Sequence, residues 1–209
     1  MDAFSNALPD FTGCIVDKRY QLVKLLGSGA YGVVYMVFDM RATSDYNAPP
    51  PYRAMKIIRK ADRDPAEVAL LRREVALHSL VEHHPNIVGM IEAFEDKDWF
   101  YIVLDYHGGG DLFEQVCEKD IYRNNDELLR KAFLSLLDAV QACHDKRIAH
   151  RDLKPENVLT SKDGSKVYLA DFGLASNERM IDNFGTGTFI YMAPGMSLYP
   201  SRFRGAHER

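Results

Sequence analysis

The chain has 209 residues, of which 46% are hydrophobic, and its formal net charge is −4. This length suits one large domain or two small ones, and the negative net charge does not indicate a nucleic-acid-binding protein. Three irregularly spaced cysteines, Cys14, Cys117 and Cys143, indicate neither a disulfide framework nor a zinc site. Residues 1–5 do not resemble a signal peptide, and no apolar run approaches a membrane span. We therefore expect a soluble protein of the cytoplasm, the nucleus or both.

Two strands joined by glycines are predicted first. The strand-like run 20–26 is followed by Gly27-Ser28-Gly29-Ala30-Tyr31-Gly32, and then by the β-branched and aromatic run 33–38. The GxGxxG spacing also occurs in dinucleotide-binding folds, where it opens a helix. Here the residues after it predict a second strand instead. We expect a glycine-rich hairpin, whose backbone amides could approach phosphate oxygens because glycine has no Cβ.

An insertion is predicted between this hairpin and the next strand. Residues 39–53 include Pro49, Pro50 and Pro51. Three successive prolines cannot continue a sheet ladder, so we expect an exposed loop of polyproline character. We interpret it as a spacer, with a docking site for a proline-reading domain as the alternative.

A strand over 54–58 and a helix are predicted next. Asp64, followed by a proline, has the residue type of a helix N-cap. Apolar side chains and one histidine then recur with helical spacing on one face, at Val68, Leu71, Val75 and His78. Glu74 lies on the same predicted helix.

The middle of the chain predicts a third apolar strand over 100–104, followed by the glycine-rich run 105–110. Asn125 then precedes a long predicted helix. Five residues form its expected apolar stripe, namely Leu129, Phe133, Leu136, Val140 and Cys143.

The most informative stretch, 150–157, reads His-Arg-Asp-Leu-Lys-Pro-Glu-Asn and places an acid, a cation and an amide at fixed offsets on one loop. Asp171-Phe172-Gly173 begins fourteen residues after it. In this order the two motifs resemble the catalytic and metal-binding loops of the eukaryotic protein kinases. The alternative, an acidic surface turn, is disfavoured by the hairpin upstream. The resemblance covers residues 18–195.

The resemblance implies a bilobal α+β fold: an N-lobe of antiparallel sheet plus one helix, and a mostly helical C-lobe that is incomplete. It also implies the catalytic roles. Asp152 accepts or orients the proton of the attacking hydroxyl, and Lys154 contacts the transferred phosphoryl group. Asn157 and Asp171 supply oxygen ligands to Mg²⁺, which keeps its remaining positions for water and phosphate oxygens.

An ATP site is implied as well. Lys56 would contact the α- and β-phosphates and pair with Glu74, although both could be ordinary exposed charges. The run 105–110 resembles the connection between the two kinase lobes. The implied ATP-contacting residues are Leu26, Gly27, Ser28, Gly29, Ala30, Tyr31, Gly32, Val34, Ala54, Lys56, Leu104, Asp105, His107, Asp111 and Leu159. Leu26, Val34, Ala54 and Leu159 would also suit a core, and the sequence leaves both roles open.

The C-terminal part departs from the family. Residues 187–194 resemble the segment that receives the substrate, but Gly195 stands where the family has Glu, and 196–204 show no helical stripe. The expected parts are an N-terminal tail (1–17), an N-lobe (18–104), a partial C-lobe (105–195) and a divergent tail (196–209). Later family helices would cover one side of the C-lobe. We therefore expect an exposed apolar patch, which marks a partner site or an aggregation liability.

The implied function is a protein serine/threonine kinase that transfers the γ-phosphate of ATP, with Mg²⁺, to hydroxyls of protein substrates. Lys154 fits the Ser/Thr type, and 187–194 resemble the fungal kinases of nutrient and meiosis control. Asp111 and Glu156 predict a preference for Arg or Lys two or three residues before the target, although Asp111 could serve only the ribose. The alternative is a truncated kinase-like fragment of little activity that acts as a binding protein or has no function.

Regulation is predicted from Arg151, which precedes Asp152 as in kinases whose activation-segment phosphate pairs with that arginine. In the middle of this segment the chain has Asp182, and the nearest hydroxyls are Ser176, Thr186 and Thr188. We interpret Thr188 as a structural part of the substrate-receiving turn. We expect activity without phosphorylation of the segment, with Asp182 substituting in part.

Overall fold

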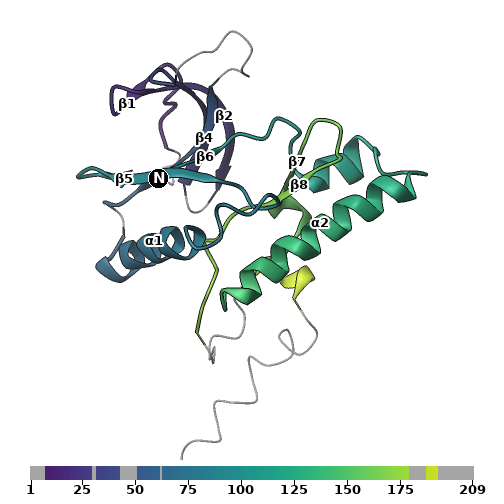
Figure 1. Ribbon diagram of the computed structural model, residues 1–209. Helices are drawn as coiled ribbons and strands as arrows, with labels where there is room; N and C mark the ends of the chain where they lie inside the picture. The colour runs from purple at the N-terminus through teal and green to yellow at the C-terminus, as the bar shows by residue number, and fades with distance from the viewer. Residues whose placement is uncertain (1–7, 30–31, 43–50, 62, 179–186, 193–209) are drawn as a thin grey trace, which may run out of the picture. The chain divides into compact units, whose positions relative to one another are not determined.

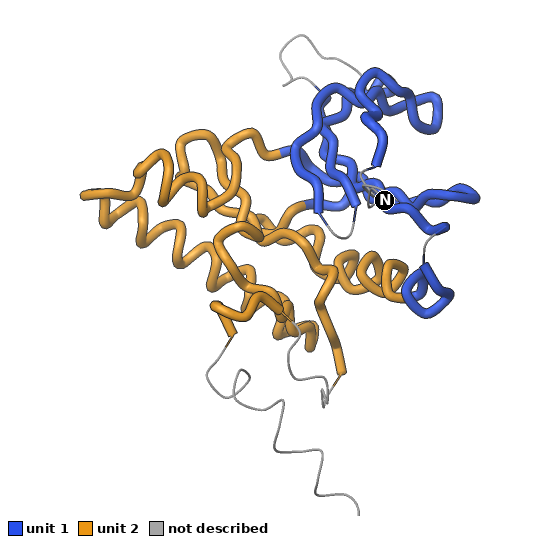
Figure 2. Tube along the Cα trace, turned by 180° about the vertical axis from the view of Figure 1, so that it is seen from behind, with its two compact units in different colours: residues 1–69, 89–106 blue, residues 70–88, 107–209 orange. Residues whose placement is uncertain are grey.

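The computed structural model describes residues 8–29, 32–42, 51–61, 63–178 and 187–192. The chain folds into two compact units, shown in Figure 2. Unit 1 comprises residues 1–69 and 89–106, and unit 2 comprises residues 70–88 and 107–209. The expected lobe boundary at 104/105 remains a prediction, and the compact units differ from it mainly by placing 70–88 with unit 2.

Unit 1 is built on a six-stranded antiparallel sheet with strand order β1-β2-β3-β4-β6-β5 (Figure 1). Its strands are β1 Ile15–Val16, β2 Tyr20–Gly29, β3 Gly32–Asp39, β4 Tyr52–Arg59, β5 Met90–Glu95 and β6 Trp99–Asp105. The hairpin of β2 and β3 closes with Gly29 opposite Gly32. This confirms a strand after the GxGxxG run and excludes the helix that a dinucleotide-binding turn would open.

One face of this sheet is the core of unit 1. Alternate residues of the strands share it, as expected for the two-residue period of a strand, and its buried members are Tyr20, Leu22, Val33, Tyr35, Val37, Met55, Ile57, Tyr101 and Val103. Leu8, Phe11 and Val16 pack on the same face. The Phe11 ring lies edge-on to Trp99 at 5.3 Å and to Tyr35 at 6.2 Å. The segment expected as a tail thus contributes to this core from residue 8 onward.

The helix α1 Pro65–His78 begins with a capping box. The Asp64 carboxylate accepts from the Glu67 amide at 2.8 Å, and the Glu67 carboxylate accepts from the Asp64 amide at 3.0 Å. The predicted N-cap is confirmed. The buried residues of α1 are Leu71, Glu74, Leu77 and His78, whereas Val68 and Val75 of the predicted face are only half-buried.

The described part of unit 2 contains the helix α2 Asp126–Asp145, the two-stranded sheet of β7 Val158–Thr160 and β8 Val167–Leu169, and three short helices. The short helices are η1 Glu114–Glu118, η2 Pro155–Asn157 and η3 Phe189–Tyr191. The predicted start of this helix at Asn125-Asp126 is confirmed, and Asn125 caps α2 by accepting from the Leu128 amide at 3.1 Å. The helix packs on β8 around a core that includes Leu77, Ile148, Leu169 and Phe172.

The predicted apolar stripe of α2 is partly wrong. Cys143 is buried, and Leu136 and Val140 pack against the core, but the Leu129 and Phe133 side chains are 48% and 59% exposed. The buried face is centred instead on Ala132 and Ala139. Small residues let the helix lie close to β8, whereas Leu129 and Phe133 face outward.

The proline-containing insertion lies mostly outside the described residues. At its end, the Asp39 amide donates to the Pro51 carbonyl at 2.9 Å, where β3 and β4 are joined. Across the described parts of the chain, none of the helices has the length and apolar character needed to span a membrane.

Candidate functional site

The loop predicted to be catalytic is closed by hydrogen bonds around Asp152, which is buried. Its Oδ2 is 2.8 Å from Lys154 Nζ, and its Oδ1 accepts from the Thr188 amide at 3.0 Å and from Thr188 Oγ1 at 2.8 Å. Lys154 Nζ also donates to Thr188 Oγ1 at 2.8 Å. An acid, a cation and a hydroxyl therefore form one hydrogen-bonded triangle.

Asn157 joins this group from η2. Its Nδ2 donates to the Asp152 carbonyl at 2.9 Å and to Asp152 Oδ2 at 2.8 Å. Both bonds use the amide nitrogen, so Oδ1 is the atom able to coordinate a cation. The Asn157 carbonyl also accepts from the Ala170 amide at 2.9 Å, which ties this loop to the residue before Asp171. The two predicted Mg²⁺ ligands, Asn157 and Asp171, thus lie on segments that are joined by a backbone hydrogen bond.

Backbone strain occurs at both loops. Arg151 has φ 70° and Asp171 has φ 59°, in the left-handed region that non-glycine residues rarely adopt. Such conformations are kept when the surrounding structure imposes them, and they cluster at functional sites. Gly187 has φ +120°, and a Cβ there would lie 2.7 Å from the Arg151 carbonyl. Glycine at 187 therefore allows the close approach that brings Thr188 to Asp152.

The charges of the loop reinforce each other. Burial acts to raise the pKa of Asp152, but hydrogen bonds from Lys154, Thr188 and Asn157 outweigh it and hold the pKa below its ordinary value. The hydrogen bond to Asp152 raises the pKa of Lys154. At neutral pH the pair is an ionised carboxylate beside an ammonium group, and the carboxylate can accept a further proton.

Phe172 is held between two histidine rings. The His78 ring of α1 stacks on it at 4.5 Å, and the His150 ring meets it edge-on at 5.0 Å. His78 Nε2 lies 2.7 Å from the Val88 carbonyl, and His150 Nε2 lies 2.9 Å from the Ala170 carbonyl. Burial lowers the pKa of His150, which keeps its ring neutral. The loop of Asp171 is therefore anchored on both sides by hydrogen-bonded rings.

Glu74 lies near the same loop. It is buried, and a Cβ on Gly173 would come within 3.4 Å of its Oε2. Lys56 belongs to unit 1 and Glu74 to unit 2. Their ion pair remains a prediction.

Four of the ATP-contacting residues expected on the strands, Val34, Ala54, Lys56 and Leu104, share one face of the sheet. In the β3–β4–β6 register, Val34 is opposite Lys56, and Ala54 is opposite Leu104. Directly paired residues of an antiparallel sheet point to the same face. This face is the reverse of the one covered by Phe11. The sheet therefore presents Lys56 among apolar side chains on the side that the N-terminal segment leaves uncovered.

The glycines of the hairpin differ in whether the structure leaves room for a side chain at their positions. A Cβ on Gly27 or Gly29 would meet no described atom within 4 Å, and neither has a positive φ. Gly32 has φ +136°, and its Cβ would lie 2.3 Å from the Ile57 carbonyl. Gly32 is thus required by the sheet, whereas nothing in the described chain requires glycine at 27 or 29. Ser28 lies on β2, Leu26 is 42% exposed there, and Ala30 and Tyr31 lie outside the described residues.

The residues after β6 have partners of their own. Asp105 forms an ion pair with Arg53 at 2.9 Å, and the His107 ring stacks on Tyr168 at 3.7 Å. Asp111 Oδ1 accepts from the Glu114 amide at 2.8 Å, so one oxygen of this carboxylate is bonded to the first residue of η1. Leu159 is half-buried on β7 and forms a backbone bridge with Asp111.

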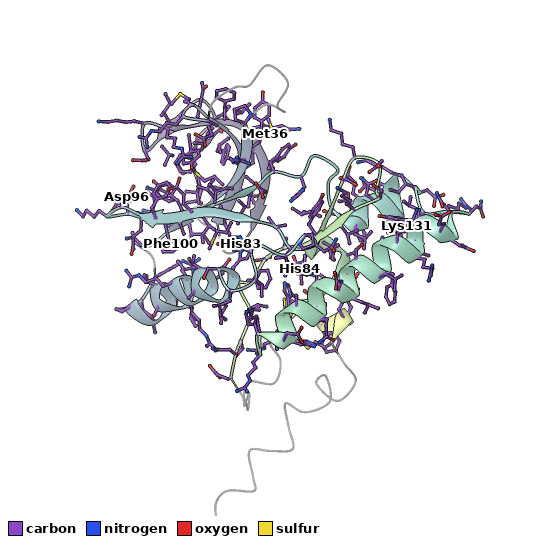
Figure 3. The ribbon with its side chains drawn as sticks, viewed as in Figure 1. Met36, His83, His84, Asp96, Phe100 and Lys131 are labelled. Atoms are coloured by element: carbon purple, nitrogen blue, oxygen red, sulfur yellow. The ribbon has the colours of Figure 1, made fainter. Side chains whose placement is uncertain are left out.

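Figure 3 labels two further histidines, His83 and His84, in the turn after α1. His83 is 93% exposed, while His84 Nε2 lies 3.4 Å from Asp138 and its Nδ1 accepts from the Asn86 amide at 3.2 Å. Within the described residues, His, Cys, Asp and Glu side chains form no group of three or more suited to a metal ion. The Mg²⁺ ligands expected here are one amide, from Asn157, and one carboxylate, from Asp171. Because this pair has only two members, the lack of a larger group among the described residues does not test it.

Sequence reasoning missed the role of Thr188, which it treated as a structural part of a turn. The contact with Asp152 spans 36 residues of sequence, and only the tertiary fold reveals it. The glycine before it, at a position with positive φ, was the one local signal. Asp182 and Thr186, named in the prediction on regulation, lie outside the described residues.

The sequence matches the protein kinase domain family over residues 20–199. The chain belongs to the protein kinase family. Among curated relatives, it is 40% identical over 182 residues to the negative regulator of sexual conjugation and meiosis of Schizosaccharomyces pombe, covering 87% of this chain and 37% of that protein. It is 36% identical over 183 residues to the serine/threonine-protein kinase ksp1 of the same yeast, covering 85% and 37%.

A plant relative, the CBL-interacting protein kinase 16 of Oryza sativa subsp. japonica, is 37% identical over 187 residues, covering 86% of this chain and 38% of that protein. The chain thus spans less than two-fifths of the length of these relatives. The resemblance to Ser/Thr kinases, including fungal ones, is confirmed. The α+β kinase fold is confirmed too, with the antiparallel sheet of unit 1 and a partial set of C-lobe elements in unit 2.

Proposed function

We propose that this chain is a protein serine/threonine kinase, which transfers the γ-phosphoryl group of ATP to Ser or Thr hydroxyls of protein substrates. The observation that carries the proposal is the bonded group of Asp152, Lys154, Asn157 and Thr188, connected through Ala170 to Asp171. Phosphoryl transfer depends on positioning and charge neutralisation more than on covalent help. This group supplies both, with a buried carboxylate and an adjacent ammonium fixed in place.

Each side chain has a step that its geometry supports. Asp152 stays ionised and accepts the proton of the attacking hydroxyl. Lys154 holds its charge beside that carboxylate, where it offsets negative charge on the transferred phosphoryl group. Asn157 fixes Asp152 through Nδ2, and its Oδ1 would hold Mg²⁺ together with the Asp171 carboxylate. Bound Mg-ATP would supply the phosphoryl group and neutralise its charge.

The nucleotide would be held by the face of the sheet that carries Lys56. Val34, Ala54 and Leu104 give this face an apolar surface suited to an adenine ring, and Lys56 supplies a cation for phosphate oxygens. Gly27 and Gly29 support this proposal, because a Cβ at either position would meet no atom of the described chain, so packing within the chain does not explain the glycines. A backbone that must come close to a ligand is a physical reason for glycine at such positions.

Substrate preference rests on finer observations. Thr188 and Lys154 both contact Asp152, so the hydroxyl acceptor would enter beside them. Glu156 is exposed, and Asp111 has one carboxylate oxygen engaged with η1. We propose that these two carboxylates favour a substrate with Arg or Lys two or three residues before the target. A peptide array with no such bias would remove this part of the proposal.

Calorimetry with Mg-ATP tests the nucleotide site. We expect binding by the folded wild-type chain, and Lys56→Met should weaken it about 10- to 100-fold, the range of a charge-assisted hydrogen bond. Lys24→Met is the matched control, because Lys24 is exposed on β2 and should leave affinity unchanged. Folded wild-type protein that gives no binding heat would contradict the proposal.

A second candidate is a binding protein with little activity. Unit 2 exposes apolar side chains on α2 and η3, namely Leu129, Phe133, Leu134, Leu137, Phe189 and Ile190, between 48% and 76% exposed. We infer that these side chains form one apolar patch, of the kind that marks an interaction surface. The two candidates are separated by sedimentation and melting with and without Mg-ATP. A kinase is stabilised by the nucleotide, whereas a binding protein self-associates or melts independently of it.

A further inference from the structure

One arginine of α1 reaches three consecutive residues of the segment after Asp171-Phe172-Gly173. Arg73 Nη2 lies 2.9 Å from Ser176 Oγ and 2.8 Å from a carboxylate oxygen of Glu178. Asn177 Oδ1 lies 3.5 Å from the same nitrogen. All these residues belong to unit 2. All three contacts are made by one nitrogen of the guanidinium, so the three residues are gathered around the end of the Arg73 side chain.

Ser176 lies at the centre of this arrangement. It is 2% exposed, and its hydroxyl oxygen also accepts from the Glu178 amide at 3.2 Å. Its backbone exchanges two hydrogen bonds with Ala149, at 2.8 and 2.9 Å. Ala149 immediately precedes His150-Arg151-Asp152. Ser176, which Arg73 contacts, is therefore bonded directly to the residue before the loop that carries Asp152.

Arg73 is also next in sequence to a candidate site residue of α1. Arg73 precedes Glu74, whose buried carboxylate lies beside Gly173. Two successive residues of α1 thus lie against this segment: Arg73 contacts Ser176 and Glu178, and Glu74 lies beside Gly173.

We propose that Arg73 is a positioning residue, which fixes the segment 176–178 and, through the Ser176–Ala149 bridge, the loop of Asp152. This inference rests on the proposed kinase function. The negative partner is Glu178, a charge built into the chain, so the contact needs no modification of the protein. The Arg73 and Glu178 side chains are 34% and 55% exposed, which makes their attraction sensitive to salt.

The test uses charge reversal and its repair. Arg73→Glu and Glu178→Arg are made singly and together in the full chain, and amide hydrogen exchange is measured at Ala149 and Ser176. Each single reversal places like charges together, and we expect exchange at these amides to rise about 3- to 10-fold. The double variant restores opposite charges and should return exchange to within about twofold of wild type. Unchanged exchange in the single variants, or no recovery in the double, would overturn the proposal.

The matched control is the ion pair of Lys131 and Glu127 on α2, which is also exposed and joins its partners at 2.7 Å. Reversing that pair should leave exchange at Ala149 and Ser176 unchanged. An equal rise would show a general effect of charge and would also overturn the proposal. Ser176→Ala, which removes only the hydroxyl, should raise exchange at the bridge by a smaller factor than Arg73→Glu.

The catalytic readout separates this inference from the proposed function. In the single variants we expect the turnover number to fall several-fold while the dissociation constant for Mg-ATP stays constant, and Arg73→Lys should recover part of the turnover. Wild-type protein that transfers no phosphate would contradict the kinase proposal alone, because the exchange measurements still decide whether Arg73 holds the segment. Normal turnover in both reversals would refute the positioning role.

Discussion

The sheet face that carries Lys56 and the loop that carries Asp152 place their side chains by different means. On the sheet, backbone register alone puts Val34 opposite Lys56 and Ala54 opposite Leu104. In the loop, Asp152 is held by side-chain hydrogen bonds from Lys154, Thr188 and Asn157, and each of these contributes to its pKa.

This difference determines what a single substitution can do. Replacing one side chain on the sheet face leaves the strand register, and therefore its neighbours, in place. Replacing one member of the bonded loop removes partners from the others, and buried polar groups without partners are costly. We expect separable effects of substitutions in the first region and coupled effects in the second.

The largest effect is expected from Asp152→Asn, which keeps the shape of the side chain and removes its charge. Phosphoryl transfer should fall about 10²- to 10⁴-fold, the usual contribution of a general base, while Mg-ATP affinity remains within a few-fold of wild type. Asp145→Asn, at the end of α2, is the control. Turnover near wild type for the Asp152 variant would mean that the loop is not the catalytic one.

Alanine substitutions of the hairpin glycines Gly32 and Gly27 should differ strongly in their effect on the free energy of unfolding. Gly32→Ala meets the Ile57 carbonyl and a positive φ, so we expect a loss of about 1–3 kcal/mol in the free energy of unfolding. Gly27→Ala should fold normally and show its effect on nucleotide affinity instead. Chemical denaturation of both variants makes the comparison, and equal destabilisation would contradict the assignment of different roles.

A smaller effect is expected on the pH profile. Thr188→Val removes a hydrogen bond that lowers the pKa of Asp152, so that pKa should rise. The acidic limb of kcat/KM, where Asp152 becomes protonated, then moves to higher pH, and Thr188→Ser should keep the wild-type profile. A carboxylate with a lowered pKa stabilises the fold above its unfolded pKa, and this contribution is lost as pH falls through the folded value. An acidic limb that does not move in the valine variant would disprove the coupling.

The smallest effect is expected on the outer face of α2. Phe133→Ser should change the free energy of unfolding by less than about 0.5 kcal/mol, because the side chain is 59% exposed. Ala139→Leu, on the fully buried face, should cost about 1–3 kcal/mol by overpacking. Thermal melting of the two variants compares the faces directly, and a larger loss for Phe133→Ser would reverse their assignment.

The strands and helix starts could be predicted because their signals are local. β2, β3, β4 and β6 follow runs of apolar and β-branched residues, and the N-caps at Asp64 and Asn125 depend on residues within three positions. The motif at 150–157 likewise identified its members without the fold.

The remaining features could not be predicted because they depend on tertiary packing. Large apolar residues occur on more than one side of α2, so periodicity selected Phe133 for the core, whereas the close approach to β8 selects Ala132 and Ala139. Thr188 reaches Asp152 across 36 residues, and Phe11 reaches Trp99 across the sheet. No window of sequence contains both partners of such contacts.

The central claim is tested most directly by transfer of labelled γ-phosphate from ATP to a protein substrate, followed by identification of the labelled amino acid. The account predicts Mg²⁺-dependent label on Ser or Thr with the wild-type chain, and a loss of about 10²-fold or more with Asp152→Asn. Label that is absent from folded wild-type protein, or equal in the two proteins, would contradict it.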